Sequence, residues 1–127
     1  MGPTGALKGP RKRAGITVFA VTDKGLGLAL RAASVYSDVV VCGPSYTGRG
    51  GLRAAVKEAF SVSKALFFIG ATGIAVRMVA PHLKGKHLDP AVVVMDDGGR
   101  FVISLLSGHL GGANELAREL AAVYGAE

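Results

Sequence analysis

The residues best suited to chemistry lie in one short stretch, residues 104–114, which reads Ser-Leu-Leu-Ser-Gly-His-Leu-Gly-Gly-Ala-Asn. An apolar run, residues 101–106, leads into a turn of small residues, 107–112, and a helical pattern follows. Three glycines and a serine leave backbone N–H groups open, and a helix that begins near Gly112 directs its positive end at whatever lies over the turn. The pattern is typical of an anion-binding site. The same turn carries His109, the side chain best suited to exchange a proton near neutral pH.

A second glycine turn, Gly70-Ala71-Thr72-Gly73, follows the apolar run 65–69 and also leads into a helical pattern. Thr72 is placed to cap that helix while a ligand oxygen takes the remaining N–H groups. Arg77, about one turn into the helix, can clamp a carboxylate with its planar guanidinium. A structural interpretation, with Thr72 as a cap and Arg77 as a surface residue, accounts for the pattern equally well.

Two other glycine-rich segments have part of a nucleotide-binding motif and lack a required residue. Residues 25–27, Gly-Leu-Gly after an apolar run, begin a dinucleotide fingerprint, but Leu30 occupies the third glycine position. Residues 43–48 have the glycine spacing of a P-loop, but Arg49-Gly50 replaces the required Lys-Ser/Thr pair. A nucleotide-binding domain therefore has only glycine turns in its favour.

The apolar runs that must position these turns predict alternating strands and helices. Strands are predicted over residues 16–21, 38–42, 65–69, 91–95 and 101–106, and helices over 25–33, 52–60, 74–79 and 113–124. Residues 96–99, Asp-Asp-Gly-Gly, are a turn signal, so the last two strands should form an antiparallel hairpin. The fold class is therefore α/β, a three-layer α/β/α domain with a mostly parallel five-stranded sheet in which the hairpin contributes one antiparallel strand.

Ligands of such sheets gather at the carboxyl ends of the strands. The turns at residues 70–73 and 107–112 both lead from a strand into a helix, so we expect them to open on the same edge. Two anion sites on one edge would suit a ligand that carries several negative groups.

Composition limits the class of protein. A chain of 127 residues, half of them apolar, is long enough for one domain. The formal charge is +6, but four of the fifteen basic residues lie in residues 1–14, where no acid occurs. Glycines and prolines in that segment predict a flexible basic leader, so residues 15–127 form a single domain and no nucleic-acid partner is expected.

The same sequence indicates a protein of the cytoplasm. Its apolar runs are far shorter than the roughly 20 residues that span a bilayer, and the pattern of a secretory signal is missing, so no membrane association is expected. The single cysteine, Cys42, is expected to be buried and gives neither a disulfide framework nor a metal-ligand spacing.

Several segments of the second half of the chain together closely resemble the amino-terminal domain of the CbiG family, the cobalt-precorrin-5A hydrolases of the anaerobic cobalamin (vitamin B12) pathway. They are residues 69–77 (Ile-Gly-Ala-Thr-Gly-Ile-Ala-Val-Arg), Pro81, Lys86, residues 89–94 (Asp-Pro-Ala-Val-Val-Val), Asp96, Gly99 and residues 104–115. The run Ser-Gly-His-Leu-Gly-Gly-Ala-Asn-Glu is the most specific part. The first half of the chain is similar only in its rhythm of strands and helices.

The resemblance implies a reaction that composition could not reveal. Water opens the δ-lactone of cobalt-precorrin-5A, and a two-carbon unit leaves as acetaldehyde to give cobalt-precorrin-5B. The substrate is a tetrapyrrole-derived macrocycle that carries its own cobalt, so no separate cofactor is expected. Its fringe of carboxylates could sit on the glycine turns and pair with Arg77 or Lys86.

For the site, the resemblance gives His109 as the candidate catalytic base, with the N–H groups of residues 108–112 facing the developing oxyanion. Two other roles stay open for His109, as an axial ligand to the cobalt of the substrate and as a structural hydrogen-bonding group. The candidate substrate-binding residues are Gly70, Thr72, Gly73, Arg77, Lys86, Asp89, Asp96, Ser107, Gly108, Gly111, Gly112 and Asn114.

Structural roles account for several of these residues as well. Ser107 is a capping hydroxyl in that interpretation, and Asn114 and Glu115 suit the first turn of a helix. Asp89 and Asp96 are also ordinary choices at strand edges. His82 and His87 belong to no pattern and are interpreted as surface residues.

Members of the family usually continue into a middle and a carboxy-terminal domain, and this sequence stops just after the motif. Either the missing domains or a separate partner chain would work with it, and if those domains complete the cleft, this chain alone would bind weakly and turn nothing over. The alternative function is a non-catalytic module of the same pathway that binds the tetrapyrrole or docks a partner.

Overall fold

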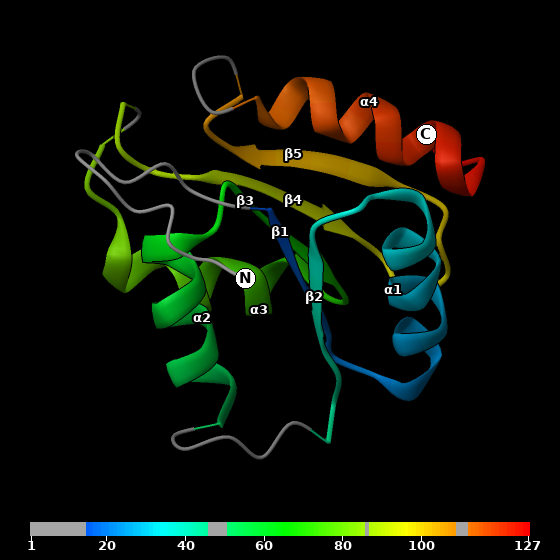
Figure 1. The fold of residues 1–127 in the computed structure, drawn as a ribbon, viewed down its shortest axis with the longest axis horizontal. Coiled ribbons are helices and arrows are strands. Elements are labelled where there is room, and N and C mark those ends of the chain that lie inside the picture. The colour runs from blue at the N-terminus through cyan, green and yellow to red at the C-terminus, as the bar shows by residue number, and fades with distance from the viewer. Residues whose placement is uncertain (1–14, 46–50, 86, 109–111) are drawn as a thin grey trace.

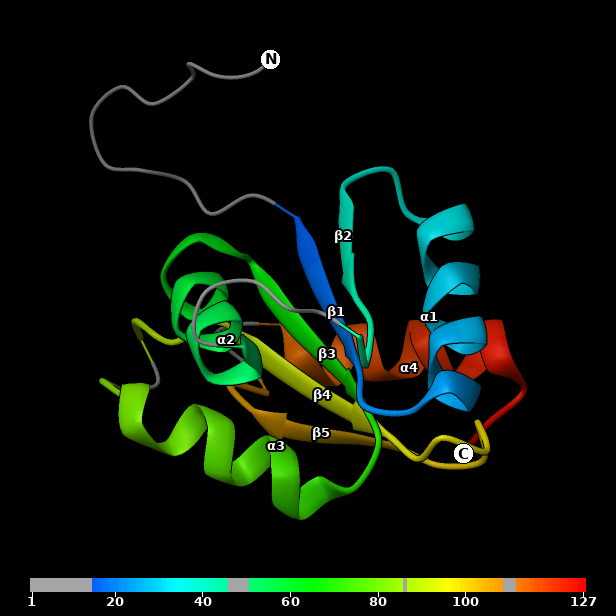
Figure 2. The same ribbon diagram turned by 90° about the horizontal axis from the view of Figure 1, so that it is seen from below.

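The computed structural model describes residues 15–45, 51–85, 87–108 and 112–127. The leader predicted for residues 1–14 lies outside them. One sheet is covered by helices on both faces (Figures 1 and 2). The elements are β1 (Ile16–Ala20), α1 (Asp23–Val35), β2 (Val39–Cys42), α2 (Gly51–Val62), β3 (Ala65–Ile69), α3 (Thr72–Val79), the 3-10 turn η2 (Ala80–His82), β4 (Ala91–Met95), β5 (Val102–Leu106) and α4 (Ala113–Tyr124).

The strand order is β2-β1-β3-β4-β5. β1 is parallel to β2 and β3, and β3 is parallel to β4, whereas β5 is antiparallel to β4. The predicted three-layer fold, with one antiparallel strand from a hairpin, is confirmed. The chain runs outward from β1 to β2 and then returns to β3, which places a topological switch point between β1 and β3.

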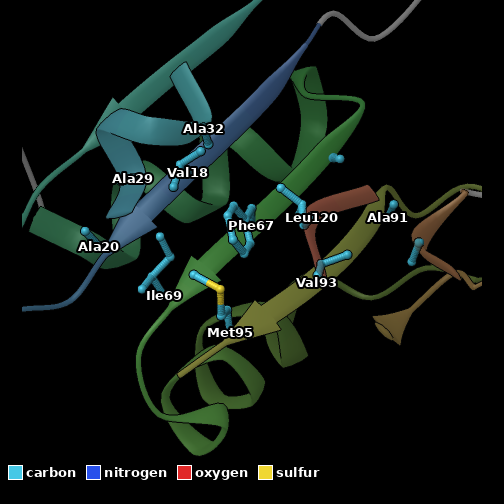
Figure 3. Close-up of a cluster of buried hydrophobic side chains, with 12 residues drawn as sticks. Val18, Ala20, Ala29, Ala32, Phe67, Ile69, Ala91, Val93, Met95 and Leu120 are labelled. Atoms are coloured by element: carbon cyan, nitrogen blue, oxygen red, sulfur yellow. The ribbon is translucent and has the colours of Figure 1, made fainter. Parts of the chain in front are cut away.

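The three central strands are apolar except for Thr17 of β1, because helices cover both of their faces. Alternate side chains of each strand therefore enter two separate cores. The core under α1 and α4 contains Val18, Ala20, Phe67, Ile69, Val93, Met95, Ala29, Ala32 and Leu120 (Figure 3). The core under α2 and α3 is built around the stacked rings of Phe19 and Phe68, whose centroids are 5.0 Å apart. Val56 and Phe60 of α2 are buried in this second core, as their spacing predicts.

Two features of the sequence fix the ends of helices. The hydroxyl oxygen of Thr22 accepts a hydrogen bond from Gly25 N at 2.9 Å, so α1 begins earlier than the apolar pattern indicates. α4 begins after Gly112 and ends at Gly125, and both glycines have positive φ angles, as is common at helix ends.

Two burial predictions are wrong in detail. Cys42 is only half-buried, because β2 is an edge strand. His82 is not a free surface side chain, since its ring packs against Phe60 at 5.9 Å between centroids. His87 is exposed, as expected.

The expectation that both glycine turns open on the same edge is wrong. Gly70 N donates to Met95 O at 2.8 Å, so the turn after β3 lies at the carboxyl end of β4. Leu106 pairs with Val92 near the start of β4, and Ser107 Oγ donates to the carbonyl oxygen of Asp89 just before it. The hairpin reverses β5, which places the end of β5 at the amino ends of the parallel strands.

Among the described residues, no helix has the length and apolar character needed to cross a membrane.

A substitution at Gly15 tests how tightly the start of β1 is packed. Its φ is +70°, and a Cβ atom there would lie 2.5 Å from the carbonyl oxygen of Asp38. We expect Gly15→Ala to lower the free energy of unfolding by about 1–3 kcal/mol, because it combines backbone strain with a clash. Gly27→Ala, at an open position on α1, should instead raise the free energy by about 0.5–1 kcal/mol. Urea denaturation measures both, and equal stability of Gly15→Ala and the parent chain would contradict the expected packing.

Candidate functional site

The structure divides the predicted site residues between the two ends of the sheet. At the carboxyl ends of the parallel strands lie Gly70, Thr72, Gly73, Arg77 and Asp96. At their amino ends lie Asp89, Ser107, Gly108, Gly112 and Asn114. His109, Lys86 and Gly111 lie outside the described residues. The two sets are separated by the length of a five-residue strand, roughly 17 Å.

At the carboxyl end, the turn between β3 and α3 is held closely against β1. A Cβ atom on Gly70 would lie 3.0 Å from Val21 Cγ2. An ideal Cβ on Gly73 would lie 3.4 Å from Arg77 Nη1, so the guanidinium folds back over the first turn of α3. The carboxylate clamp at Arg77 stays a prediction.

The predicted capping role of Thr72 is wrong. The N-cap residue of α3 is Ala71, which makes no side-chain capping bond, and Thr72 is already the first helical residue. A cap must stand one position earlier, outside the helical backbone, for its side chain to reach the free N–H groups.

Asp96 is engaged within its own hairpin. Its carboxylate accepts hydrogen bonds from the backbone N–H groups of Gly98, Arg100 and Phe101, at 3.1, 2.9 and 2.8 Å. Burial raises the pKa of the Asp96 carboxyl, but these donors outweigh burial and hold the pKa below its ordinary value. The neighbouring Asp97 accepts a hydrogen bond from Thr22 Oγ1 at 3.1 Å, which ties the hairpin to the start of α1.

At the amino end, hydrogen bonds close the turn between β5 and α4 at its base. Ala113 N donates to Ser107 O at 3.1 Å, and Asn114 N donates to Gly108 O at 3.0 Å. These two N–H groups at the start of α4 are therefore not open to an anion, and the expectation for the N–H groups of residues 108–112 stays a prediction. Ser107 is not the cap of α4, because Gly112 holds that position and Ser107 Oγ bonds to Asp89 O at 3.2 Å.

Ser107 also adopts a strained backbone. Its φ is +59°, and among the described residues it is the one non-glycine with a positive φ. Such a conformation costs a serine roughly 1 kcal/mol or more and is found most often where function requires a particular geometry.

Asn114 covers the residue that directly precedes His109. A Cβ atom on Gly108 would lie 2.7 Å from Asn114 Oδ1 and 2.9 Å from Nδ2. The carboxamide thus occupies the space that any side chain at position 108 would need. This contact explains why a glycine stands there.

Asp89 holds the loop that leads into β4. It is 8% exposed, and its two carboxylate oxygens accept hydrogen bonds from Lys84 N at 2.9 Å and Gly85 N at 3.2 Å. Through its own carbonyl oxygen it also accepts the hydroxyl of Ser107. Asp89 therefore joins this loop to the base of the β5–α4 turn.

A cleft of about 440 Å³ opens beside the start of α4. The titratable side chains in its lining are Tyr36, Asp38, Lys64, Glu115 and Glu119. Tyr36 donates to Glu119 Oε1 at 3.0 Å, and burial together with this carboxylate raises the pKa of Tyr36 to about 12. With three carboxylates against one ammonium group, the cleft repels polyanions.

A second cleft, of about 580 Å³, opens between α2 and η2. Among the described residues, Lys57, His82 and Lys84 line it, together with one acid, Glu58. The mostly basic lining of this cleft suits carboxylates better than the mostly acidic lining of the first cleft does.

Of the residues that line these clefts, sequence reasoning named Gly112 as a site residue and missed the titratable ones. Tyr36, Asp38 and Lys64 lie just before β2 and β3, far apart along the chain. Only the strand order brings the amino ends of those strands together, so no motif could have found them.

Within the described residues, no group of three or more histidine, cysteine, aspartate or glutamate side chains is placed to hold a metal ion.

Comparisons with known proteins agree on one family. Residues 54–127 match the model described as Cobalamin synthesis G N-terminal. The chain is 47% identical over 120 residues to the cobalt-precorrin-5A hydrolase of Salmonella typhimurium, and the match covers 88% of this chain and 34% of the relative. It is 42% identical over 123 residues to the enzyme of the same name from Priestia megaterium, covering 87% of this chain and 33% of the relative.

A solved structure agrees with these matches. The crystal structure of a cobalamin biosynthesis protein G homolog from Sulfolobus solfataricus is similar with a TM-score of 0.72 and 28% identity, over 88% of this chain and 35% of that chain. The chain thus spans about a third of the length of the curated relatives that it matches.

The contact between Gly108 and Asn114 predicts a coupling between two substitutions. We expect Gly108→Ala to lower the free energy of unfolding by about 1–3 kcal/mol, because the new methyl group overlaps the carboxamide. In a chain that already carries Asn114→Ala, the same change should cost at least about 0.5 kcal/mol less. Urea denaturation of the four variants gives the coupling, and additive effects would argue against the contact.

The Asp96 carboxylate predicts a pH dependence of stability. Since its pKa is lower in the folded chain than in the unfolded chain, its contribution is complete above the unfolded pKa, about 3.9, and is lost as the pH falls through the folded pKa. We expect Asp96→Asn to be less stable than the parent at pH 7, and the difference to shrink below about pH 4. Denaturation measured from pH 7 to pH 2.5 checks this. A constant difference over that range would show that the charge is not involved.

Proposed function

Because the chain belongs to the cobalamin synthesis G N-terminal family, we propose that it is the amino-terminal part of a cobalt-precorrin-5A hydrolase. The observation that carries the proposal is the 47% identity over 120 residues to a relative of that name. In the proposed reaction, water opens the δ-lactone of the substrate and acetaldehyde leaves as a carbon–carbon bond breaks. The substrate brings its own cobalt, so the proposal needs no further cofactor.

This chemistry requires a base that activates water and donors that stabilise the developing oxyanion. We assign the base to His109, which follows Gly108 directly in the β5–α4 turn. The closed base of the turn, the Asn114 carboxamide over Gly108 and the tie from Ser107 to Asp89 support this assignment, because each fixes the backbone from which the histidine extends.

We further propose that the substrate approaches from the amino ends of the parallel strands. The β5–α4 turn and both clefts lie at this end of the sheet. Lys57 and Lys84 in the second cleft suit the carboxylate fringe of the macrocycle, whereas the carboxylates of the first cleft would repel it. The β3–α3 turn with Arg77 stays a separate predicted anion site at the opposite end.

A substitution of His109 tests the base. In anaerobic assays of acetaldehyde release from cobalt-precorrin-5A, coupled to alcohol dehydrogenase, we expect His109→Ala to lower the rate at least about 100-fold. Binding of the macrocycle, followed by its absorbance, should change little. His87→Ala controls for the loss of an exposed histidine from the neighbouring loop, and it should keep most of the parent rate. Full activity of His109→Ala would overturn its role as the base.

Because this chain spans only about a third of the length of its relatives, its activity has to be compared with that of a full-length relative. The assay should be run on this chain and on the full-length Salmonella typhimurium relative, each as the parent protein and with the corresponding histidine replaced. If this chain binds the macrocycle but releases no acetaldehyde while the relative does, the domain is a binding module and other domains supply part of the chemistry. Release by this chain alone would place the catalytic apparatus within its residues.

A further inference from the structure

The last residue of the chain pairs with the outer edge of β5. β5 is the final strand of the sheet, so one side of its backbone has no neighbouring strand among the described residues. Glu127 N donates to Arg100 O at 2.9 Å, and Val102 N donates to Glu127 O at 2.7 Å. Glu127 thus forms one backbone hydrogen bond with the residue before Phe101 and one with the residue after it. This is the pattern of parallel strand pairing. Glu127 therefore lies where the first residue of a sixth strand would lie.

The connection through α4 has the handedness that such a strand needs. α1 and α4 cover the same face of the sheet, β5 runs opposite to β1, and the free edge of β5 lies at the other end of the sheet from β2 (Figure 1). Consider a rotation by 180° about the axis perpendicular to the sheet. It superposes the path from β1 through α1 to β2 on a path from β5 through α4 to the position beyond β5. The two crossovers have the same hand, and parallel crossovers are right-handed in about 98% of cases.

The side chains of this edge also lack protection. β5 reads Val-Ile-Ser-Leu-Leu, without the charges or prolines that commonly block an edge strand. Phe101 and Ile103 are 48% and 43% exposed. Val102 packs in the core under α1 and α4, so by the alternation of a strand Phe101 and Ile103 lie on the opposite face.

We infer that the free edge of β5 is the docking site for a sixth strand, parallel to β5, formed by the polypeptide that comes after the matched region in the longer proteins of the family. The matched relatives are about three times as long as this chain and so carry such a segment. Glu127 sets the register, and α4 becomes the helix of a β5–α4–strand unit. The edge is then the place where this domain is joined to the next part of the longer chain.

Amide hydrogen exchange at Ser104 tests the inference. Val102 N–H points to Glu127, so by the two-residue period of a strand the N–H of Ser104 points to the same free edge, and that of Ile103 points to β4. Three chains are compared by NMR: the 127-residue chain, the chain extended by the segment that comes after the matched region in the Salmonella typhimurium relative, and the chain extended by a Gly/Ser sequence of equal length, which stays flexible.

The native extension should slow exchange at Ser104 at least about tenfold, and the Gly/Ser extension should not. Ile103 should exchange slowly in all three chains and serves as the internal control. Equal exchange at Ser104 in the native and Gly/Ser chains would overturn the inference. Protection that appears in the 127-residue chain and rises with its concentration would also overturn it, because a second copy of the chain would then occupy the edge.

Discussion

The reversal of the chain between β4 and β5 is the constraint on which the arrangement of this molecule depends. An antiparallel neighbour ends where its partner begins, so the turn after β5 lies at the amino ends of the parallel strands. The β5–α4 turn is thereby separated from the β3–α3 turn. It is placed instead beside the loop held by Asp89 and beside the acidic cleft, whose lining includes Gly112.

Backbone hydrogen bonds then make that edge rigid. The carboxylate of Asp89, a buried residue, accepts hydrogen bonds from two backbone N–H groups. Two further backbone bonds close the β5–α4 turn at Ser107 and Gly108. A turn held in this way can keep a non-glycine residue at a positive φ, because the surrounding bonds offset the strain.

Much of the fold can be predicted from the sequence. β3, β4 and α4 have the predicted boundaries, because uninterrupted apolar runs and well-placed glycines define them locally. The family resemblance, which depends on the run from Ser107 to Glu115, is confirmed by the family match over residues 54–127. The predicted start of α1 and cap of α3 are wrong, because a capping bond depends on where the backbone leaves the strand and not on residue type alone.

The sequence by itself determined the alternation of strands and helices, the hairpin and the residues of the candidate motif, since each depends on neighbours along the chain. Only the tertiary structure decided which of these residues lie together. Pairing direction is a property of two strands, so Gly70 and Ser107, which look alike as turns, lie at opposite ends of the sheet. Tyr36, Lys64 and Glu119 line one cleft for the same reason, because strand order and helix packing bring distant segments side by side.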